Sequence, residues 1–442
     1  MGLEEVGHVG LLFGIPGQPD RMSCRHRPGR GRRRVAREGE DVPIRLKASV
    51  RAVRRGPREA AQSRARFLLH PRFANDACRI SAAGACRFVK ITFVIGVASL
   101  AGGNRVVATY ARLLKARGHE VTVVSRPWPR RTALNRLRAT LRGRPLRPHP
   151  SSPLFEALGD SHRVLDRRRP VTAADVPDAD VVVATWWETA EWVAAFPASK
   201  GRKFYLLQDV ELFDHLPIDR VRATYELPLH KLAVSGYIRD RVCEEQPEAE
   251  IGLLPNAVDH TLFTAPPRDR GRPFTVGFLH SSAPRKRVEL AFATVEAARA
   301  RLPDLQVLAF GSKADPSEIP PGIVYRRAPP EREIPGLYAA CDLWLFTSAH
   351  EGFGLPLLEA MACRTPVLAT RAGAAPDLID GRNGRLLPPD PEAFSAEIET
   401  ISRMDPAEWR AMSDAAHATA AAYSWEAATD RLLGYFTEAE RP

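Results

Sequence analysis

A short stretch in the C-terminal third of the chain, HEGFGLPLLEA at residues 350–360, combines charge with conformational freedom. It places Glu351 and Glu359 on either side of Gly352 and Gly354, and it directly follows the apolar run LWLFTS. Carboxylates accept hydrogen bonds from pairs of hydroxyls, and glycines let a backbone turn sharply and approach a ligand closely. The spacing therefore predicts a holder for a ligand that is rich in hydroxyls.

The elements expected around this stretch also favour a phosphate. The apolar run is typical of a buried strand, so Glu351 would lie in a loop at the carboxyl edge of a sheet. The next helix would begin near Leu355 and Pro356, because proline is favoured in the first helical turn. Free amides at a helix start suit a phosphate, and Glu359 would face the same ligand one turn later. A plain strand, turn and helix with capping carboxylates is the alternative interpretation.

Strand and helix patterns alternate from Phe88 onward. FVKITFVIGVA is apolar throughout, as in a buried parallel strand, and SLAGGNR is expected to be a glycine turn. VVATYARLLKARG has apolar residues at helical spacing and is closed by Gly118, and HEVTVVS is the next strand. A strand, helix and parallel strand in this order indicate an α/β fold with right-handed crossovers.

The same alternation restarts at FTVGFLHSS, after the linker APPRDRGRP. A chain of 442 residues is too long for one ordinary core. We therefore expect two Rossmann-like domains that face each other across a cleft, where open parallel sheets bind ligands. The expected parts are a basic extension (1–87), an acceptor domain (88–265) and a donor-nucleotide domain (271–420). A C-terminal helix (421–442) is expected to pack back across the domains.

The net charge of +12 lies almost entirely at the N-terminus, because residues 1–87 hold 19 Lys and Arg against 8 Asp and Glu. This segment has little periodicity and is expected to be disordered. Contact of the basic arm, or of the Arg-rich residues 126–148, with an anionic membrane is a second interpretation, and nucleic-acid binding is a third. The native start could also lie near Val89, where VKITFVI begins the first clean strand; the intact mass of the natively expressed protein would decide this.

Six cysteines lack the spacing of metal or redox sites and fit a reducing compartment. No apolar run reaches the ~18 residues that span a bilayer, and the first twenty residues lack the pattern of a secretory signal. These features predict a cytoplasmic protein, with peripheral contact at the inner face of the membrane as one variant.

The stretch 350–360 is followed by PVLAT, GAAPDLID, Asn383-Gly384 and Asp390. In this order the motifs resemble the GT-B glycosyltransferases, specifically the retaining family-4 type. The resemblance covers about residues 88–435. YLLQDVELF and LAVSGYIRD are similar to the rhamnan-synthesis subgroup, which are rhamnosyltransferases that use a dTDP-sugar.

The resemblance implies roles for individual residues. Glu359 would accept the ribose hydroxyls of the nucleotide and Glu351 would hold the transferred sugar. Lys286 would neutralise the diphosphate, and because Ser281 stands where the family has an arginine, Arg285 or Arg287 would supply the missing charge. Backbone amides of the turn would contact the sugar and the diphosphate: Gly352, Phe353, Gly354 and Leu355.

On the other domain, Gly102 and Gly103 match the family's glycine turn, which faces the donor phosphate or the acceptor. Asp209 is either an acceptor-side or catalytic group, or a loop carboxylate that caps a helix. Trp186 and Trp187, with Glu188 beside them, are either an acceptor platform or packing residues.

The resemblance implies retaining transfer of a sugar from a nucleotide-diphosphate donor to a glycan or lipid-linked acceptor, as in cell-surface polysaccharide synthesis. No Asp-x-Asp element stands at a suitable place, so no metal and no cofactor is expected, and no nucleic-acid partner is expected. A sugar-nucleotide epimerase of the same two-domain plan is the rival enzyme class. A nucleic-acid-binding or membrane-binding protein that acts through its basic arm is the rival outside the enzymes.

Overall fold

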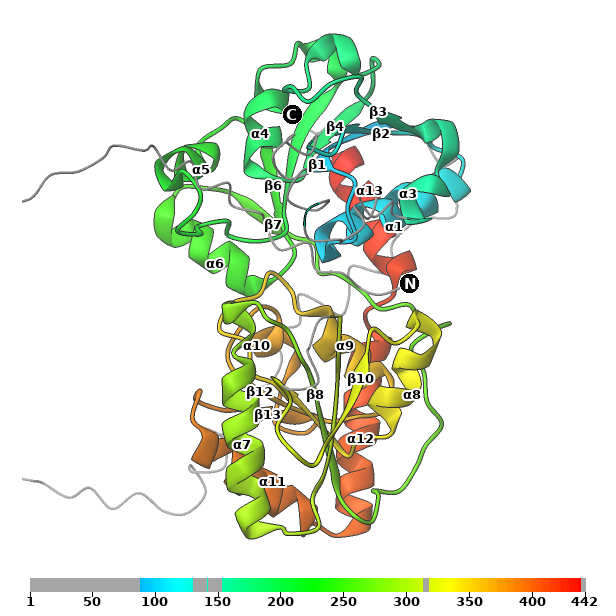
Figure 1. Cartoon of the computed structure of the whole chain (residues 1–442). Helices are drawn as coiled ribbons and strands as arrows, with labels where there is room; N and C mark the ends of the chain where they lie inside the picture. The colour runs from blue at the N-terminus through cyan, green and yellow to red at the C-terminus, as the bar shows by residue number, and fades with distance from the viewer. Residues whose placement is uncertain (1–87, 130–140, 142–152, 313–317, 439–442) are drawn as a thin grey trace, which may run out of the picture. The chain divides into compact units, whose positions relative to one another are not determined.

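The computed structural model describes residues 88–129, 141, 153–312 and 318–438 (Figure 1). The N-terminal extension and most of the Arg-rich segment after residue 126 lie outside the described residues, so the predictions about them stay predictions. The described chain forms two parallel sheets with helices packed on them, which confirms the predicted α/β class.

The first sheet has seven strands in the order β3-β2-β1-β4-β5-β6-β7, and neighbouring strands are parallel. This is the doubly wound order, in which the chain changes direction beside β1 and leaves a crevice at the carboxyl ends of the strands. The strands are β1 (Lys90–Val97), β2 (Glu120–Arg126), β3 (His162–Val164), β4 (Val181–Ala184), β5 (Arg202–Leu207), β6 (His230–Ala233) and β7 (Ile251–Leu253).

Among the described residues, five helices lie between these strands along the chain. They are α1 (Gly102–Ala116), α3 (Pro153–Glu156), α4 (Trp187–Ala194), α5 (Ile218–Thr224) and α6 (Gly236–Glu245).

The predicted glycine turn before α1 is wrong in one respect, because Gly102 and Gly103 are the first helical residues rather than part of the turn. The turn is made before them: Asn104 donates through Nδ2 to the carbonyl of Val97 at 2.7 Å and to the Ser99 hydroxyl at 2.7 Å. Such side-chain bonds to nearby groups hold a helix start in place. The predicted helix end is confirmed, with Gly118 at a φ of 87°.

The second sheet repeats the topology with six strands in the order β10-β9-β8-β11-β12-β13. Its strands are β8 (Thr275–Leu279), β9 (Gln306–Gly311), β10 (Ile323–Arg327), β11 (Leu343–Phe346), β12 (Val367–Ala369) and β13 (Gly384–Leu386). Its helices are α7 (Val288–Arg301), α8 (Ile334–Ala339), α9 (Leu355–Ala362), α10 (Ala375–Leu378), α11 (Pro391–Ser402) and α12 (Pro406–Ala421).

In the second sheet, β11 and β12 are buried on both faces, which explains why they are apolar at every position, whereas the edge strand β10 ends in two exposed arginines. In β11, Leu343 and Leu345 belong to the core formed with α7 and α11, whereas Trp344 and Phe346 belong to the core formed with α8 and α9. This alternation follows from the period of two in a strand.

The terminal helix α13 (Trp425–Glu438) packs on α1 of the first sheet, and the two lie side by side in Figure 1. Trp425 meets Tyr110 edge to face at 5.4 Å between ring centroids, and Phe436 meets Phe204 at 4.9 Å. The chain therefore returns from the second sheet to the first before it ends.

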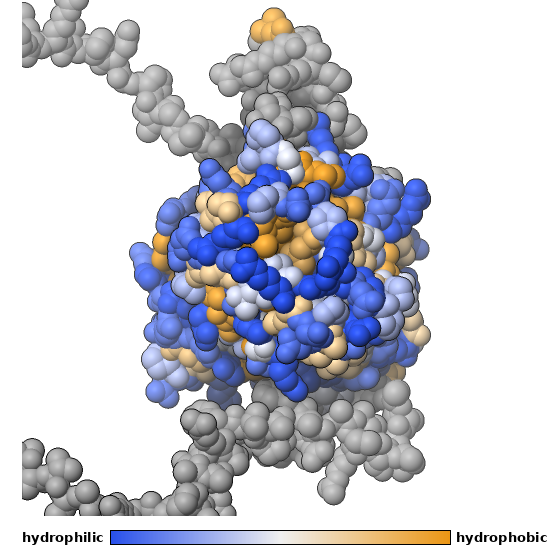
Figure 2. All heavy atoms as spheres, turned by 90° about the horizontal axis from the view of Figure 1, so that it is seen from below, coloured by the Kyte–Doolittle hydropathy of each residue, from blue (hydrophilic) through white to orange (hydrophobic). Residues whose placement is uncertain are grey.

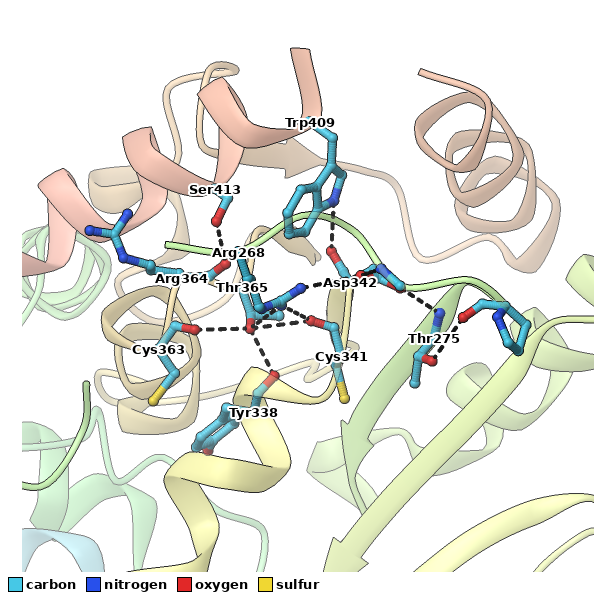
Figure 3. A network of polar contacts seen from close by, with 12 residues as sticks. Arg268, Thr275, Tyr338, Cys341, Asp342, Cys363, Arg364, Thr365, Trp409 and Ser413 are labelled. Atoms are coloured by element: carbon cyan, nitrogen blue, oxygen red, sulfur yellow. Dashed lines mark hydrogen bonds and ion pairs between the residues drawn. The ribbon is translucent and has the colours of Figure 1, made fainter. Parts of the chain in front are cut away.

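The linker that enters β8 is fixed to the second sheet by a polar network (Figure 3). Asp342, buried at the start of β11, accepts hydrogen bonds from the backbone N–H groups of Gly271 at 2.7 Å and Thr275 at 2.8 Å. Arg268 donates to the same carboxylate at 3.2 Å and lies 4.8 Å over the ring of Trp409. The network fixes the entry to the sheet that carries the 350–360 stretch.

Hydrophilic and hydrophobic residues are interspersed on the face seen from below (Figure 2). In the part of the chain that the structure describes, no helix has both the length and the apolar composition needed to cross a bilayer.

Candidate functional site

Two loops at the carboxyl edge of the second sheet bring a lysine and a glutamate together. Lys286 ends the short helix η5 (Pro284–Lys286) after β8, and Glu351 lies in the loop after β11. Lys286 Nζ donates to Glu351 Oε1 at 2.6 Å, and the Ser348 hydroxyl donates to the same oxygen at 2.8 Å. The two charged side chains are only 11% and 10% exposed. The lysine predicted to neutralise the diphosphate and the glutamate predicted to hold the sugar therefore meet in one buried contact.

A small hollow opens beside this pair. It is lined by Leu279, Lys286, Trp344, Leu345, Phe346, Thr347, Ser348, Glu351 and Pro356. Among the described residues Glu351 Oε2 has no hydrogen-bond partner. That oxygen can accept from a hydroxyl of a ligand while Oε1 keeps its contact with the lysine.

Helix α9 begins at this hollow and confirms the helix start predicted from the sequence. Its N-cap is Gly354, at a φ of 91°, and no side chain caps the helix; Pro356 stands in the first turn. Pro356 has no N–H and Leu357 donates to the Gly354 carbonyl at 3.0 Å, so the N–H of Leu355 is the first at this uncapped end that could meet an anion. Leu355 is the first residue of α9, and it directly precedes Pro356, which lines the hollow.

Glu359 lies one turn into α9 and is partly buried. Its Oε2 accepts from the Tyr338 hydroxyl at 2.9 Å. Burial raises the pKa of Glu359, and the neighbouring cations Arg105 and Lys286 act against that rise. The two cations that act on this carboxylate come from different sheets, Arg105 from the first and Lys286 from the second.

The glycines of the turn serve close packing. A Cβ on Gly352 would fall 1.8 Å from the carbonyl oxygen of Gln208, and its own carbonyl accepts from the Ser235 hydroxyl at 2.7 Å. A Cβ on Gly354 would fall 2.6 Å from the ring of Phe346. Phe353 is 4% exposed and belongs to the core. One side of the turn is therefore packed against residues of the first sheet, and the other side meets the hollow.

Asp209, from the loop after β5, meets the turn through a histidine. Its Oδ1 contacts Nε2 of His350, whose Nδ1 lies 3.0 Å from the Tyr237 hydroxyl. Asp209 also accepts from the backbone N–H of Val210 at 2.8 Å. The sequence singled out Asp209, but neither His350 nor Tyr237 was assigned a role, because the three residues are far apart along the chain.

Glu211 fixes the loop that carries Asp209. It is 1% exposed, its φ is 60°, and its Oε2 accepts from the backbone N–H of Trp187 at 2.7 Å and from the Tyr205 hydroxyl at 3.3 Å. Its Oε1 is buried without a partner among the described residues. Burial raises the pKa of Glu211 well above its usual value, because no cation compensates the loss of water.

The predicted donor glycines lie at the start of α1. A Cβ on Gly102 would meet nothing within 4 Å, whereas one on Gly103 would lie 3.1 Å from the side-chain amide of Gln208. Arg105, one turn further, forms an ion pair with Glu331 of η7 (Glu331–Glu333), before α8. The sequence analysis missed Arg105, although its place two residues after a pair of glycines at a helix start was a usable signal.

The other predicted residues lie at the edges of this arrangement. Arg285 is exposed, and its backbone carbonyl accepts from the N–H of Ala349 at 2.7 Å. Glu188 forms an ion pair with Arg126 at 2.6 Å, so it is not a free acceptor-side carboxylate. Trp187 is 5% exposed and packs in the core. In the described ranges no group of three or more His, Cys, Asp or Glu could hold a metal ion.

Two family models match the chain, one on each half. Residues 100–262 match the model described as Glycosyltransferase Family 4, and residues 273–403 match the model described as Glycosyl transferases group 1. The second range contains the whole 350–360 stretch and Lys286.

Curated relatives resemble parts of the chain. It is 33% identical over 108 residues to an O-antigen chain mannosyltransferase B of Escherichia coli, covering 24% of this chain and 28% of that protein. It is 32% identical over 189 residues to a GDP-mannose-dependent alpha-mannosyltransferase of Mycolicibacterium smegmatis, covering 42% and 48%. A D-inositol 3-phosphate glycosyltransferase of the same species is 29% identical over 214 residues, covering 43% and 48%. The chain spans less than half the length of these relatives.

Solved structures share the fold over most of the chain. Anabaena HepE in complex with UDP and glucose has a TM-score of 0.58 at 18% identity, covering 79% of this chain and 100% of that chain. A glycosyltransferase from Rickettsia africae has a TM-score of 0.61 at 15% identity, covering 80% and 100%. The predicted fold of two Rossmann-like domains is thus confirmed, and it is the GT-B fold that these solved structures share.

Proposed function

We propose that the chain transfers a sugar from a nucleotide-diphosphate donor to an acceptor hydroxyl, with retention at the anomeric carbon. The observation that carries the proposal is the Lys286–Glu351 pair in the hollow at the start of α9. A cation, a carboxylate with one free oxygen and an uncapped helix start provide the three contacts that a sugar diphosphate needs. HepE, whose fold is similar, is described in complex with UDP and glucose.

Each group has a role in the proposed reaction. The bond between the anomeric carbon and the diphosphate oxygen breaks, and negative charge grows on the leaving phosphate. Lys286 and the first amides of α9 stabilise that charge, which is the main source of rate in such transfers. Glu351 orients the sugar through its free oxygen, and Glu359 accepts from the ribose hydroxyls. Arg285, which is exposed near Lys286, adds positive charge on the solvent side.

The acceptor oxygen forms the new bond to the anomeric carbon, and its proton passes to the leaving phosphate, so neither a protein nucleophile nor a metal is required. Asp209, with its contact to His350, stands where the first sheet meets the turn and would orient the acceptor. Gly102, with open space where a Cβ would be, leaves room for the donor or the acceptor. Closure of the site would exclude water and limit hydrolysis.

The stretch Gln208-Asp209-x-Glu211 favours a dTDP-rhamnose donor. The acceptor would be a glycan or a lipid-linked glycan, and the product would be part of a cell-surface polysaccharide. The relatives named for mannosyl transfer make GDP-mannose the other donor to test.

A thermal-shift panel tests the proposal, with UDP, GDP, ADP and dTDP and their common sugars as ligands. At least one nucleoside diphosphate should raise the melting temperature, and Lys286→Ala should remove most of that shift. Lys90→Ala is the matched control, because Lys90 belongs to an exposed Lys–Glu pair, 50% and 52% exposed.

The proposal fails if no nucleotide stabilises the protein, or if Lys286→Ala responds like the wild type. Incubating the best donor alone separates transfer from epimerisation. An epimerised sugar nucleotide would support the epimerase, whereas slow release of free sugar fits a transferase without its acceptor.

A further inference from the structure

Arg105 connects the helix start of the first sheet to the second sheet. It lies in the first turns of α1, and its guanidinium forms an ion pair with Glu331, 226 positions further along the chain. The side chains are 25% and 50% exposed. Ion pairs this exposed contribute little to stability, so stabilisation alone is a weak reason for the contact.

The helix start makes Arg105 an unusual cation. α1 has no acidic residue in its first turn and no side-chain cap, so the positive end of its dipole is not offset within the helix. Arg105 adds a full positive charge to the same end. Gly102 leaves open space beside it. Among the described residues, the ion pair of Arg105 is with Glu331.

Glu359 connects Arg105 electrostatically to the proposed donor site. Glu359 interacts electrostatically with Arg105 and with Lys286, and both oppose the rise that burial causes in its pKa. Glu331 also interacts with Glu359, and its negative charge raises the pKa of Glu359. Arg105 and Lys286 are thus the cations of the first and the second sheet beside the same carboxylate.

The three charged side chains Lys286, Glu351 and Glu359 at the second-sheet edge carry no net positive charge of their own. Lys286 is already neutralised by Glu351 at 2.6 Å. Glu359, when ionised, leaves the group of Lys286, Glu351 and Glu359 with a net charge of about −1, counting one unit charge per residue. Arg285 adds positive charge only on the solvent side, so Arg105 of the first sheet, which interacts with Glu359, would strengthen the binding of a nucleoside diphosphate.

We propose that Glu331 holds Arg105 in the empty protein and that the diphosphate of the nucleotide donor replaces Glu331 as its partner. The guanidinium would then donate to phosphate oxygens in the geometry that suits it. Glu331 competes with the donor for Arg105, so it lowers donor affinity and keeps the first helix turn neutral until a donor arrives. This inference rests on the proposed function, because it needs a nucleotide diphosphate at this edge.

Opposite effects of the two partners test the proposal. Titration calorimetry would measure the affinity of UDP, GDP, ADP and dTDP for the full chain. Arg105→Gln should weaken the best of them about tenfold to a hundredfold, the range for a hydrogen bond between charged groups. Glu331→Gln should strengthen it several-fold, and Arg105→Lys should retain part of the affinity. The matching nucleoside monophosphate should lose less than the diphosphate in Arg105→Gln.

Arg301→Gln and Glu392→Gln are the matched controls, because this ion pair of 2.9 Å lies between α7 and α11 and is similarly exposed. Neither control should change affinity. Equal losses in Arg105→Gln and Glu331→Gln would show a purely structural ion pair and overturn the inference, as would an unchanged affinity in Arg105→Gln. If the wild type binds none of the four nucleotides, the proposed function fails as well; if it binds one and the Arg105 variant binds it equally, this inference fails alone.

Discussion

The carboxyl edges of the two sheets differ in how their polar groups are assembled. At the second edge, Ser348, Glu351 and Glu359 come from one short segment, and Lys286 reaches Glu351 from the neighbouring loop. At the first edge, Asp209 contacts His350, which lies in the loop after β11 of the second sheet. Glu211 is buried, and its Oε1 has no partner among the described residues. The second edge already holds the Lys286–Glu351 ion pair. The first edge depends on contacts between parts of the chain that are far apart in sequence.

This difference predicts where substitutions act. At the second edge a change should affect chemistry, because the groups already face a hollow. Behind it a change should affect folding, because the network of Figure 3 joins the linker to the second sheet through several hydrogen bonds to the buried Asp342. At the contact between the edges a change should affect both.

The largest effect is expected from Glu351→Gln. The change keeps the shape of the side chain but removes the charge that orients the sugar and holds Lys286. Loss of one preorganised electrostatic contact typically costs about 10²–10³ in rate. Transfer, or donor hydrolysis in the absence of an acceptor, measures this. Glu120→Gln, in the exposed pair with Lys90, should keep the wild-type rate; equal rates in both variants would contradict the assignment of Glu351.

Asp342→Ala should lower the free energy of unfolding, whereas the activity per folded molecule should change little. It leaves two backbone N–H groups and Arg268 without their acceptor. Breaking a buried charge pair in this way costs about 3–5 kcal/mol. Urea denaturation measures the loss. Asp390→Ala, which removes the exposed N-cap of α11, should cost only about 1 kcal/mol. Similar losses in both variants would show that the network of Figure 3 is no more than local capping.

Gly352→Ala should lower both stability and activity. Its Cβ would overlap the carbonyl oxygen of Gln208 at 1.8 Å, so the turn would have to move away from the first sheet. Overpacking of this kind costs about 1–3 kcal/mol. Gly434→Ala, in α13 with nothing within 4 Å, is the control and should gain about 0.5–1 kcal/mol. A wild-type melting temperature and rate in Gly352→Ala would show that the turn does not rest on Gln208.

The smallest effect is a pH dependence from Glu211. Its pKa is raised well above 4.5 by burial, so the folded protein binds this proton more tightly than the unfolded chain does. The contribution to stability is complete below about pH 4.5 and is lost as the pH rises through the raised pKa. Glu211→Gln removes the titration, so melting temperatures measured from pH 4.5 upward should fall less steeply than in the wild type. Parallel curves would contradict a protonated Glu211.

Much of the fold could be predicted from the sequence, because apolar runs and helical spacing are local signals. The strands on each side of α1, the end of that helix at Gly118 and the start of α9 at Leu355 are confirmed. The start of α1 was wrong by a few residues. Two glycines favour a turn, but Asn104 holds the turn that precedes them and lets the helix begin at Gly102.

The site was predictable only where it is local. The glutamates flanking a glycine turn identified the second edge, and their spacing placed Glu359 on the helix. Contacts across the sheets left no pattern in the sequence: Asp209 with His350, and Arg105 with Glu331, are 141 and 226 positions apart. The roles of all these residues in binding stay predictions.

A crystal structure of the full chain with its tightest-binding nucleoside diphosphate would test the central claim most directly. We predict phosphate oxygens within hydrogen-bond distance of Lys286 Nζ and of the first amides of α9, and the ribose hydroxyls on Glu359. A nucleotide bound elsewhere, with the Lys286–Glu351 contact and the hollow beside it unchanged, would contradict the claim.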